Sequence, residues 1–474
     1  MSYNSFQQSR NKRSGSRIRA SGFSDDQEYE ENLETESDIV ESENKQGSLE
    51  VVNNPKSTEE KNCLLPFHFN SNEIICVANI LASAFGVGIF TFPYILYEIG
   101  VINSLFVFII LSISVYFSID LLRRFVVDSK LFSYSEITKA TLGNCWQKVY
   151  AISTFSFYIS NIINSLKIIN NLAKSMMSFL NDTLPKIFYS LIIFVIELLL
   201  CIFTSNLSKI YILSFIALAG FLISLFIVII KGIIVLSTDK DRFKYFYFFT
   251  IQNETSSSWD KFLKLMAKII EFYYGYICHS TFPTLLSELN DLENENTKRI
   301  HNTSFGIMCT IYALFSFFGL FCIENIDKNN DKNILFINGN DLTENNALIC
   351  IYKSILIILF ISVIPLRYLI IRDNYTSIIG KEIIPQKIEI IITTIFFIIT
   401  NLFIYFADFD LISNLILIFG GFFGVIIGFV LPVINYVAIN GRTKIRSIIG
   451  YIIAGIFVII GFFSIFYNFK EVNS

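Results

Sequence analysis

The sequence TFPYILYE occupies residues 91–98, and TFPTLLSE occupies residues 281–288. The two stretches share five of eight residues at an offset of 190 positions. Five of the long apolar segments given below separate their starts, so the helices that carry them run in opposite directions across a membrane. A five-helix inverted repeat leaves this trace in a sequence, although chance similarity in an apolar chain of low diversity is the competing explanation.

The composition indicates a polytopic membrane protein. Of the 474 residues, 53% are hydrophobic and only 16% are charged, whereas a soluble globular chain has about 25% charged residues. The charges are dense in the first 70 residues and sparse in the long apolar runs, as expected where a charge inside the bilayer is costly. The basic residues are scattered, which argues against nucleic acid binding.

The chain is therefore predicted to be all-α, with eleven transmembrane helices, because about 20 mostly apolar residues cross the hydrocarbon layer. We expect the spans near 74–98, 101–122, 149–172, 187–204, 209–236, 264–286, 304–323, 347–371, 386–406, 412–439 and 445–467. The first five spans (about 74–236) and the next five (about 264–439) form the two repeats, and 445–467 is an extra helix. Residues 71–474 thus make up the transmembrane domain.

The positive-inside rule places the N-terminus in the cytosol. With that orientation the cytosolic connections carry most of the basic residues: Arg123, Arg124, Lys130, Lys139, Lys209, Lys298, Arg299, Arg372, Lys381, Arg442, Lys444 and Arg446. Residues 1–70 have no early apolar run and too few apolar residues for a core, so we expect a disordered cytosolic tail without a signal peptide. This tail is a candidate docking segment for a cytosolic partner.

Both repeated stretches lie beside predicted helix breaks. Gly86 and Gly88 precede Pro93 in the first, and Gly275 and the segment 278–281 precede Pro283 in the sixth. Glycine loosens a helix and proline removes a donor. An unwound segment at mid-membrane exposes N–H groups that hold a carboxylate and C=O groups that hold a cation, and a zwitterionic amino acid carries both charges. Tight helix packing is the alternative explanation for the glycines.

Four motifs of the chain resemble those of the amino acid/auxin permease family, in its neutral amino acid transporter branch of solute carriers. They are Asn79-Ile80-Leu81 with Gly86-Val87-Gly88-Ile89 and Phe92-Pro93-Tyr94; Cys278-His279 with Pro283 and Glu288-Leu289; Ile364-Pro365-Leu366-Arg367; and Phe419-Gly420-Gly421 with Phe429-Val430-Leu431-Pro432 and Tyr436. The motifs span roughly residues 74–440, and their order and spacing make the resemblance more specific than any one of them.

The resemblance implies a LeuT-like fold of two inverted five-helix repeats plus one helix. It also implies a secondary active amino acid transporter that works by alternating access. It would place the substrate carboxylate at the amides near Gly86 and the side chain near Tyr274, Tyr276 or residues 278–280. The candidate substrate-binding residues are Ala84, Phe85, Gly86, Val87, Gly88, Tyr274, Tyr276, Cys278, His279 and Ser280.

The chain departs from sodium-coupled members of this family in two places. Ala82 stands where they tend to have Asn, and residues 355–361 contain no hydroxyl. Sodium prefers hard oxygen ligands, so we expect proton coupling or exchange, with a sodium-coupled symporter as the alternative. The candidate proton carriers are Glu197, Glu271 and His279, each of which has a purely structural alternative.

Other functions have less support. An intramembrane enzyme built on His279 lacks an identifiable catalytic partner, so no enzymatic activity is expected. An amino acid sensor that uses the same site and a carrier for polyamines remain alternatives. The eight cysteines show no metal-ligand spacing, and we expect neither a metal nor a cofactor. No address signal distinguishes the plasma membrane from an internal vacuolar or lysosome-like membrane.

Overall fold

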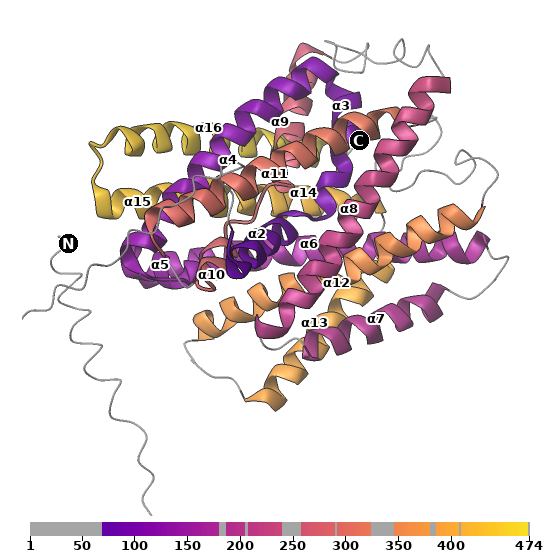
Figure 1. The fold of residues 1–474 in the computed structure, drawn as a ribbon, viewed down its shortest axis with the longest axis horizontal. Helices are drawn as coiled ribbons and strands as arrows, with labels where there is room; N and C mark the ends of the chain where they lie inside the picture. Colours follow the sequence, from indigo (N-terminus) through magenta and orange to yellow (C-terminus); the bar gives the residue numbers. More distant parts are fainter. Residues whose placement is uncertain are drawn as a thin grey trace, which may run out of the picture. The chain divides into compact units, whose positions relative to one another are not determined.

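The computed structural model describes residues 69–179, 186–203, 207–238, 257–289, 292–323, 346–379, 385–406 and 409–472. All regular elements in these ranges are helical (Figure 1). Most of the predicted tail, residues 1–68, lies outside the described residues. Residues 69–474 form one compact unit.

The first half of the unit begins with a broken helix. Its elements are α2 (Ser71–Ala84), the short 3-10 helix η1 (Val87–Thr91), α3 (Phe92–Ile99), α4 (Val101–Ser129), α5 (Tyr134–Leu142), α6 (Asn144–Phe179), α7 (Lys186–Phe203) and α8 (Leu207–Thr238). Asn70 caps α2, and its backbone N–H donates to Oε2 of Glu73 at 3.0 Å. The turn between α3 and α4 is made at Gly100, whose φ of 87° favours glycine.

The second half repeats the broken-helix start. Its elements are α9 (Ser258–Tyr274), α10 (Phe282–Leu286), α11 (Asn294–Phe321), α12 (Asn346–Ile379), α13 (Gln386–Phe406), α14 (Phe409–Val425), the π-helical segment η5 (Ile426–Val430), α15 (Leu431–Asn440) and the final helix α16 (Ile445–Val472). Every predicted span overlaps one of these helices or a helix pair interrupted by a break. α4, α11 and α12 extend several residues beyond the predicted spans.

Within the described ranges, seven helices are long and apolar enough to cross a membrane. The α2–α3 pair, bent by 55° at its break, makes an eighth span if it is taken as one. The other predicted spans correspond to α6, α7 and the α9–α10 pair, so the number eleven stays a prediction. Large apolar side chains such as Phe106, Phe226 and Phe406 are exposed on these helices, which suits contact with lipid.

The two halves interlock around one continuous apolar core. α6 of the first half packs on α12 and α14 of the second, and α8 packs on α11 and α12. Figure 1 shows α7 and α13 side by side next to α12, as their contacts require. The broken helices therefore sit inside a frame made by helices of both halves.

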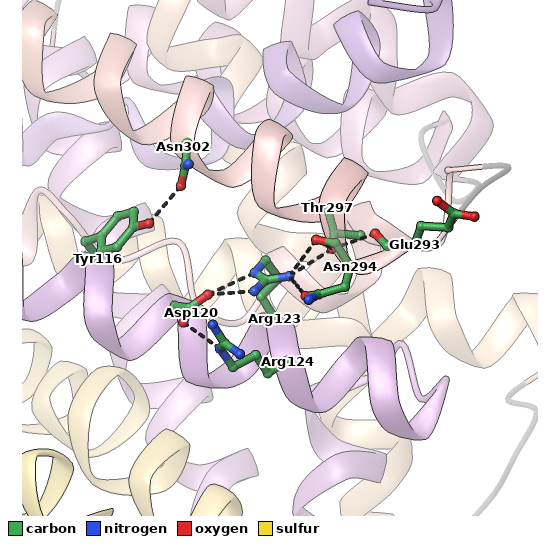
Figure 2. Close-up of polar contacts among 8 residues, drawn as sticks. All are labelled: Tyr116, Asp120, Arg123, Arg124, Glu293, Asn294, Thr297 and Asn302. Carbon is green, nitrogen blue, oxygen red and sulfur yellow. Dashed lines mark hydrogen bonds and ion pairs between the residues drawn. The ribbon is translucent and has the colours of Figure 1, made fainter. Parts of the chain in front are cut away.

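A fully buried arginine joins α4 to the start of α11 (Figure 2). Arg123 donates from Nε and Nη2 to Oδ1 of Asp120 at 3.0 and 2.8 Å. Its Nη1 donates to Oδ1 of Asn294 at 2.7 Å and to Oγ1 of Thr297 at 3.0 Å. Arg124 contacts the other Asp120 oxygen at 2.7 Å. Because a buried charge is stable only when it is paired and hydrogen-bonded, this cluster fixes the α4–α11 contact.

Candidate functional site

The first break separates α2 from η1. α2 ends at Ala84, the backbone of Phe85 and Gly86 is extended, and helix resumes at Val87. The N–H of Phe85 closes α2 by donating to the Leu81 carbonyl at 2.8 Å. Pro93 lies in the first turn of α3, where its missing N–H has little effect.

The second break is longer and separates α9 from α10. α9 ends at Tyr274, and α10 begins at Phe282 with Pro283 in its first turn. Between them the chain makes short turns, such as the bond from the Tyr276 N–H to the Tyr273 carbonyl at 2.8 Å. All residues of this connecting segment from 275 to 280 are buried. Both predicted interruptions are thus present.

The two breaks contact each other directly. A Cβ added to Gly88 would lie 2.8 Å from the Cα and 2.9 Å from the N of Gly275, so only glycine fits there. The hydroxyl of Tyr312, on α11, lies 2.7 Å from the carbonyl oxygen of Gly275 and 3.1 Å from that of Ala84. The hydroxyl of Tyr312 is therefore within hydrogen-bond distance of one carbonyl from each break.

The guanidinium of Arg367, on α12, reaches the first break. A Cβ added to Gly86 would overlap its Nη2 and lie 3.4 Å from its Cζ. Nη1 donates to Oγ of Ser165 at 2.7 Å and to the carbonyl of Asn161 at 3.3 Å, both on α6. The guanidinium is therefore held between α6 and the unwound backbone of the first span.

Three candidate residues of the second break carry buried polar atoms without a hydrogen-bond partner among the described residues. These are Oη of Tyr274, Oγ of Ser280 and both ring nitrogens of His279. Such groups are uncommon in protein interiors, because leaving a buried donor or acceptor unpaired costs about 1–3 kcal/mol. Their concentration at one place makes the second break a candidate binding site.

A cavity of about 330 Å³ reaches the second break from one side. Ser280 and Thr281 line it together with Asn79 of α2, Tyr150 of α6 and Asn374 of α12. Its other lining residues are Ser83, Lys130, Phe132, Ser133, Tyr134, Ser135, Glu136, Ser214, Thr284, Leu285, Glu288, Leu366, Leu369, Ile370 and Asp373. Lys130, Glu136 and Asp373 are exposed, so the cavity opens to the surface at that end. It has the size of a small-molecule site.

The opposite side of the breaks is closed by aromatic rings. Phe85 stacks on Phe221 with ring centres 4.3 Å apart, and Phe90 packs edge-on against Phe315 at 5.0 Å. Phe92 packs edge-on against Tyr312 at 5.3 Å. These rings are buried and pack against one another on this side.

Buried ion pairs lie further along the same closed side. Glu98 at the end of α3 contacts Lys264 at 3.2 Å and Lys268 at 2.5 Å, both on α9. Lys268 also contacts Glu271 at 2.7 Å. These contacts join the second part of the first broken helix, α3, to the first part of the second, α9, whereas the cavity reaches the breaks from the side of α2 and α10.

The structure distributes the remaining sequence candidates over several surroundings. Oη of Tyr276 lies 3.0 Å from Oγ of Ser112 on α4, and Cys278 is buried beside it in the break. His279 faces η5, where a Cβ on Gly428 would lie 3.2 Å from its Cε1. Glu197, on α7, is fully buried, and neither carboxylate oxygen has a hydrogen-bond partner in the described part of the chain.

Sequence reasoning missed two residues of the site, Arg367 and Tyr312. Arg367 was noticed only as part of a motif at the end of a span, whereas α12 continues to Ile379 and places the residue inside the helix. A charge within a membrane span is itself a signal of function. Tyr312 has no such signal, because a tyrosine in an apolar helix is common.

The structure resembles those of known transporters. A substrate-bound, outward-open Na⁺-coupled sialic acid symporter matches with a TM-score of 0.55 and 13% identity, over 84% of this chain and 88% of that chain. A manganese transporter of Eremococcus coleocola in complex with an aromatic bis-isothiourea substituted compound matches with a TM-score of 0.56 and 11% identity, over 84% and 86% of the two chains. At these identities the likeness shows the fold alone, which is a transporter fold.

Sequence comparison identifies the family. No curated protein sequence matches the chain. The profile of a family described as "transmembrane amino acid transporter protein" matches residues 70–472, which is nearly the whole chain and includes all four motifs. With its apolar helices, this match makes the chain an integral, multi-pass membrane protein. The chain belongs to the transmembrane amino acid transporter family.

Proposed function

We propose that the protein is a secondary active transporter that carries amino acids by alternating access through the two helix breaks. The observation that carries this proposal is the meeting of both breaks at Gly88 and Gly275, beside the unpartnered polar groups of Tyr274, His279 and Ser280. Free peptide groups of both signs suit a zwitterion. The family match supports an amino acid as the substrate.

The one-sided access fits one state of such a cycle. With the N-terminus in the cytosol, the loop that contains Lys130 and Glu136 is cytosolic, and the cavity opens inward. The ion pairs of Glu98 with Lys264 and Lys268 then close the outer side. In the other state these pairs separate and the cavity collapses, as one group of helices rocks against the other.

The arrangement proposed for the chain is eleven spans in two inverted five-helix repeats with α16 as the extra helix. α6, α7 and the α9–α10 pair complete the count. α6 carries polar residues on the faces that pack inside the bundle, such as Asn161 and Ser165, which lowers its mean hydropathy without exposing those groups to lipid.

We propose a proton or an exchanged substrate as the coupling partner. His279 and Glu197 are buried and unpartnered within the described residues, so either can take up a proton without first breaking a hydrogen bond. Glu271 already contacts Lys268 and is the weaker candidate. Ala82 is fully buried in α2, and its side chain offers no oxygen to sodium.

Uptake of a panel of radiolabelled amino acids into proteoliposomes tests the function, with pH and sodium varied independently. We expect saturable uptake of at least one amino acid, which persists without sodium and rises when the outside is acidified. Strict sodium dependence would favour the symporter alternative. A lack of uptake or exchange of every amino acid, in protein shown to be folded, would reject the proposal.

A further inference from the structure

Arg367 is a buried cation without an acidic partner. Its side chain is 5% exposed, and no Asp or Glu in the described ranges forms an ion pair with it. Four other arginines, Arg123, Arg124, Arg299 and Arg372, each contact a carboxylate. A buried charge is normally paired, because desolvation costs several kcal/mol per ion. Within the described ranges, therefore, no side chain supplies the counterion of Arg367.

The guanidinium is hydrogen-bonded on one side and lies against Gly86 on the other. Nη1 is held by Ser165 and Asn161 of α6, whereas Nη2 points at Gly86, where a Cβ would overlap it. Only a residue without a side chain leaves room there.

Arg367 also lies on the path from the cavity. Ile370 and Asn374 line the cavity, and they follow Arg367 on α12 by three and seven residues. Residues at these spacings share one face of a helix. Leu366, next to Arg367 in the chain, lines the cavity as well, so Arg367 adjoins the cavity wall on α12 without lining it.

We propose that the guanidinium of Arg367 binds the carboxylate of the transported amino acid. This inference rests on the proposed transport function and adds to it the residue that recognises the carboxylate. The substrate carboxylate supplies the missing counterion, and a guanidinium matches a carboxylate with two parallel hydrogen bonds. A free carboxylate is then a condition for transport, so amines and amino acid esters are rejected.

Competition in proteoliposomes that contain the purified full-length protein tests this role. The label is leucine, and the unlabelled competitors are leucine, isoamylamine and leucine methyl ester. A matched trio replaces them if another amino acid gives the greater uptake. In the wild type we expect only the free amino acid to compete. Arg367→Met should raise KM by about tenfold to a hundredfold and remove most of the preference for the acid over the amine.

Two further variants separate recognition from folding. Arg367→Lys keeps the positive charge but cannot form two parallel hydrogen bonds with a carboxylate. Ser165→Ala removes only a hydrogen bond that holds the guanidinium in place. Both variants should raise KM severalfold while kcat stays near the wild-type value. Arg372→Lys, a conservative change on the same helix, should leave KM unchanged.

Each outcome has one reading. A wild type that takes up leucine, with unchanged KM and unchanged discrimination in Arg367→Lys and Ser165→Ala, overturns the role of Arg367 and leaves the transport function intact. If only Arg367→Met loses uptake, the KM values of Arg367→Lys and Ser165→Ala decide whether the loss reflects recognition or folding. A wild type without uptake of any amino acid overturns both.

Discussion

The backbone of Gly88 lies against the backbone of Gly275, so that a Cβ on Gly88 would lie 2.8 Å from the Cα of Gly275. The two glycines come from the interrupted helices of the two predicted repeats. Their contact is the point at which the two helix breaks meet. It requires that Gly88 has no side chain, and a Cβ on Gly275 would lie 2.6 Å from the ring of Phe92.

Gly88→Leu should abolish uptake without preventing membrane insertion. The side chain would have to displace the backbone of Gly275, which cannot move aside as the end of a flexible side chain can. Gly88→Ala should already lower uptake by about tenfold or more, if holding the breaks apart removes about 1.4 kcal/mol of stabilisation. Uptake normalised to the amount of inserted protein measures both. Gly306→Ala is the control, since its Cβ would meet nothing within 4 Å.

The ion pairs of Glu98 predict a conformational shift. Glu98→Gln removes the contacts to Lys264 and Lys268, and breaking a buried ion pair costs about 3–5 kcal/mol. The inward-open state should lose population. We expect a cysteine introduced at Ser133, in a chain with Cys63 and Cys145 replaced by serine, to react severalfold more slowly with a membrane-impermeant thiol reagent applied from the cavity side.

Asp260→Asn is the control for that experiment. It breaks the exposed contact with Lys470, which joins α9 to α16, and exposed pairs contribute only about 0–1 kcal/mol. Labelling at position 133 should not change in this variant. Equal labelling in the wild type and in Glu98→Gln would show that the ion pairs do not hold the outer side closed.

Glu197 and His279, whose side chains have no hydrogen-bond partner among the described residues, are the predicted source of the pH dependence of uptake. If His279 or Glu197 carries the coupling proton, His279→Gln or Glu197→Gln should flatten the rise of uptake at acid pH while exchange of labelled for unlabelled substrate continues. Uptake measured across a pH series without sodium shows which of the two residues carries the proton. Glu271→Gln, which disrupts a contact to Lys268, serves as the comparison. A pH response that survives in all three variants would exclude these residues as carriers.

The α4–α11 cluster predicts a purely structural effect. Arg123→Met leaves Asn294 and Thr297 without their buried donor and should destabilise the protein by about 3–5 kcal/mol. We expect a lower melting temperature in detergent and less inserted protein, with KM unchanged. Arg124→Met, which removes a partly exposed contact to the same Asp120, should have a much smaller effect. Equal effects of the two would contradict the assignment.

The helices and the breaks could be predicted because both follow from local sequence. Apolar runs of about 20 residues locate the spans, and glycines followed by Pro93 and Pro283 locate the interruptions. Polar residues weaken this signal where they are buried between helices. For that reason α6 and α9 are helical as predicted and yet fall short of the hydropathy of a simple span.

The contacts within the site could not be predicted, because they join residues far apart in the chain. Arg367 meets Gly86 across 281 positions, and Tyr312 meets Ala84 across 228. Glu271 was a coupling candidate from its depth in the sixth span, and the structure adds the lysine that pairs with it. The sequence contains the residue types, whereas the folding of the halves decides which of them become neighbours.

The position of Tyr312 has one more consequence. The hydroxyl of Tyr312 has a single hydrogen, but two carbonyl oxygens, those of Ala84 and Gly275, lie within hydrogen-bond distance of it. At every instant one of these oxygens goes without that hydrogen. For the proposed amino acid substrate, this predicts that its ammonium group finds a free acceptor at the oxygen that does not hold the hydrogen. Because one hydrogen serves two acceptors, one carbonyl oxygen stays available to a substrate.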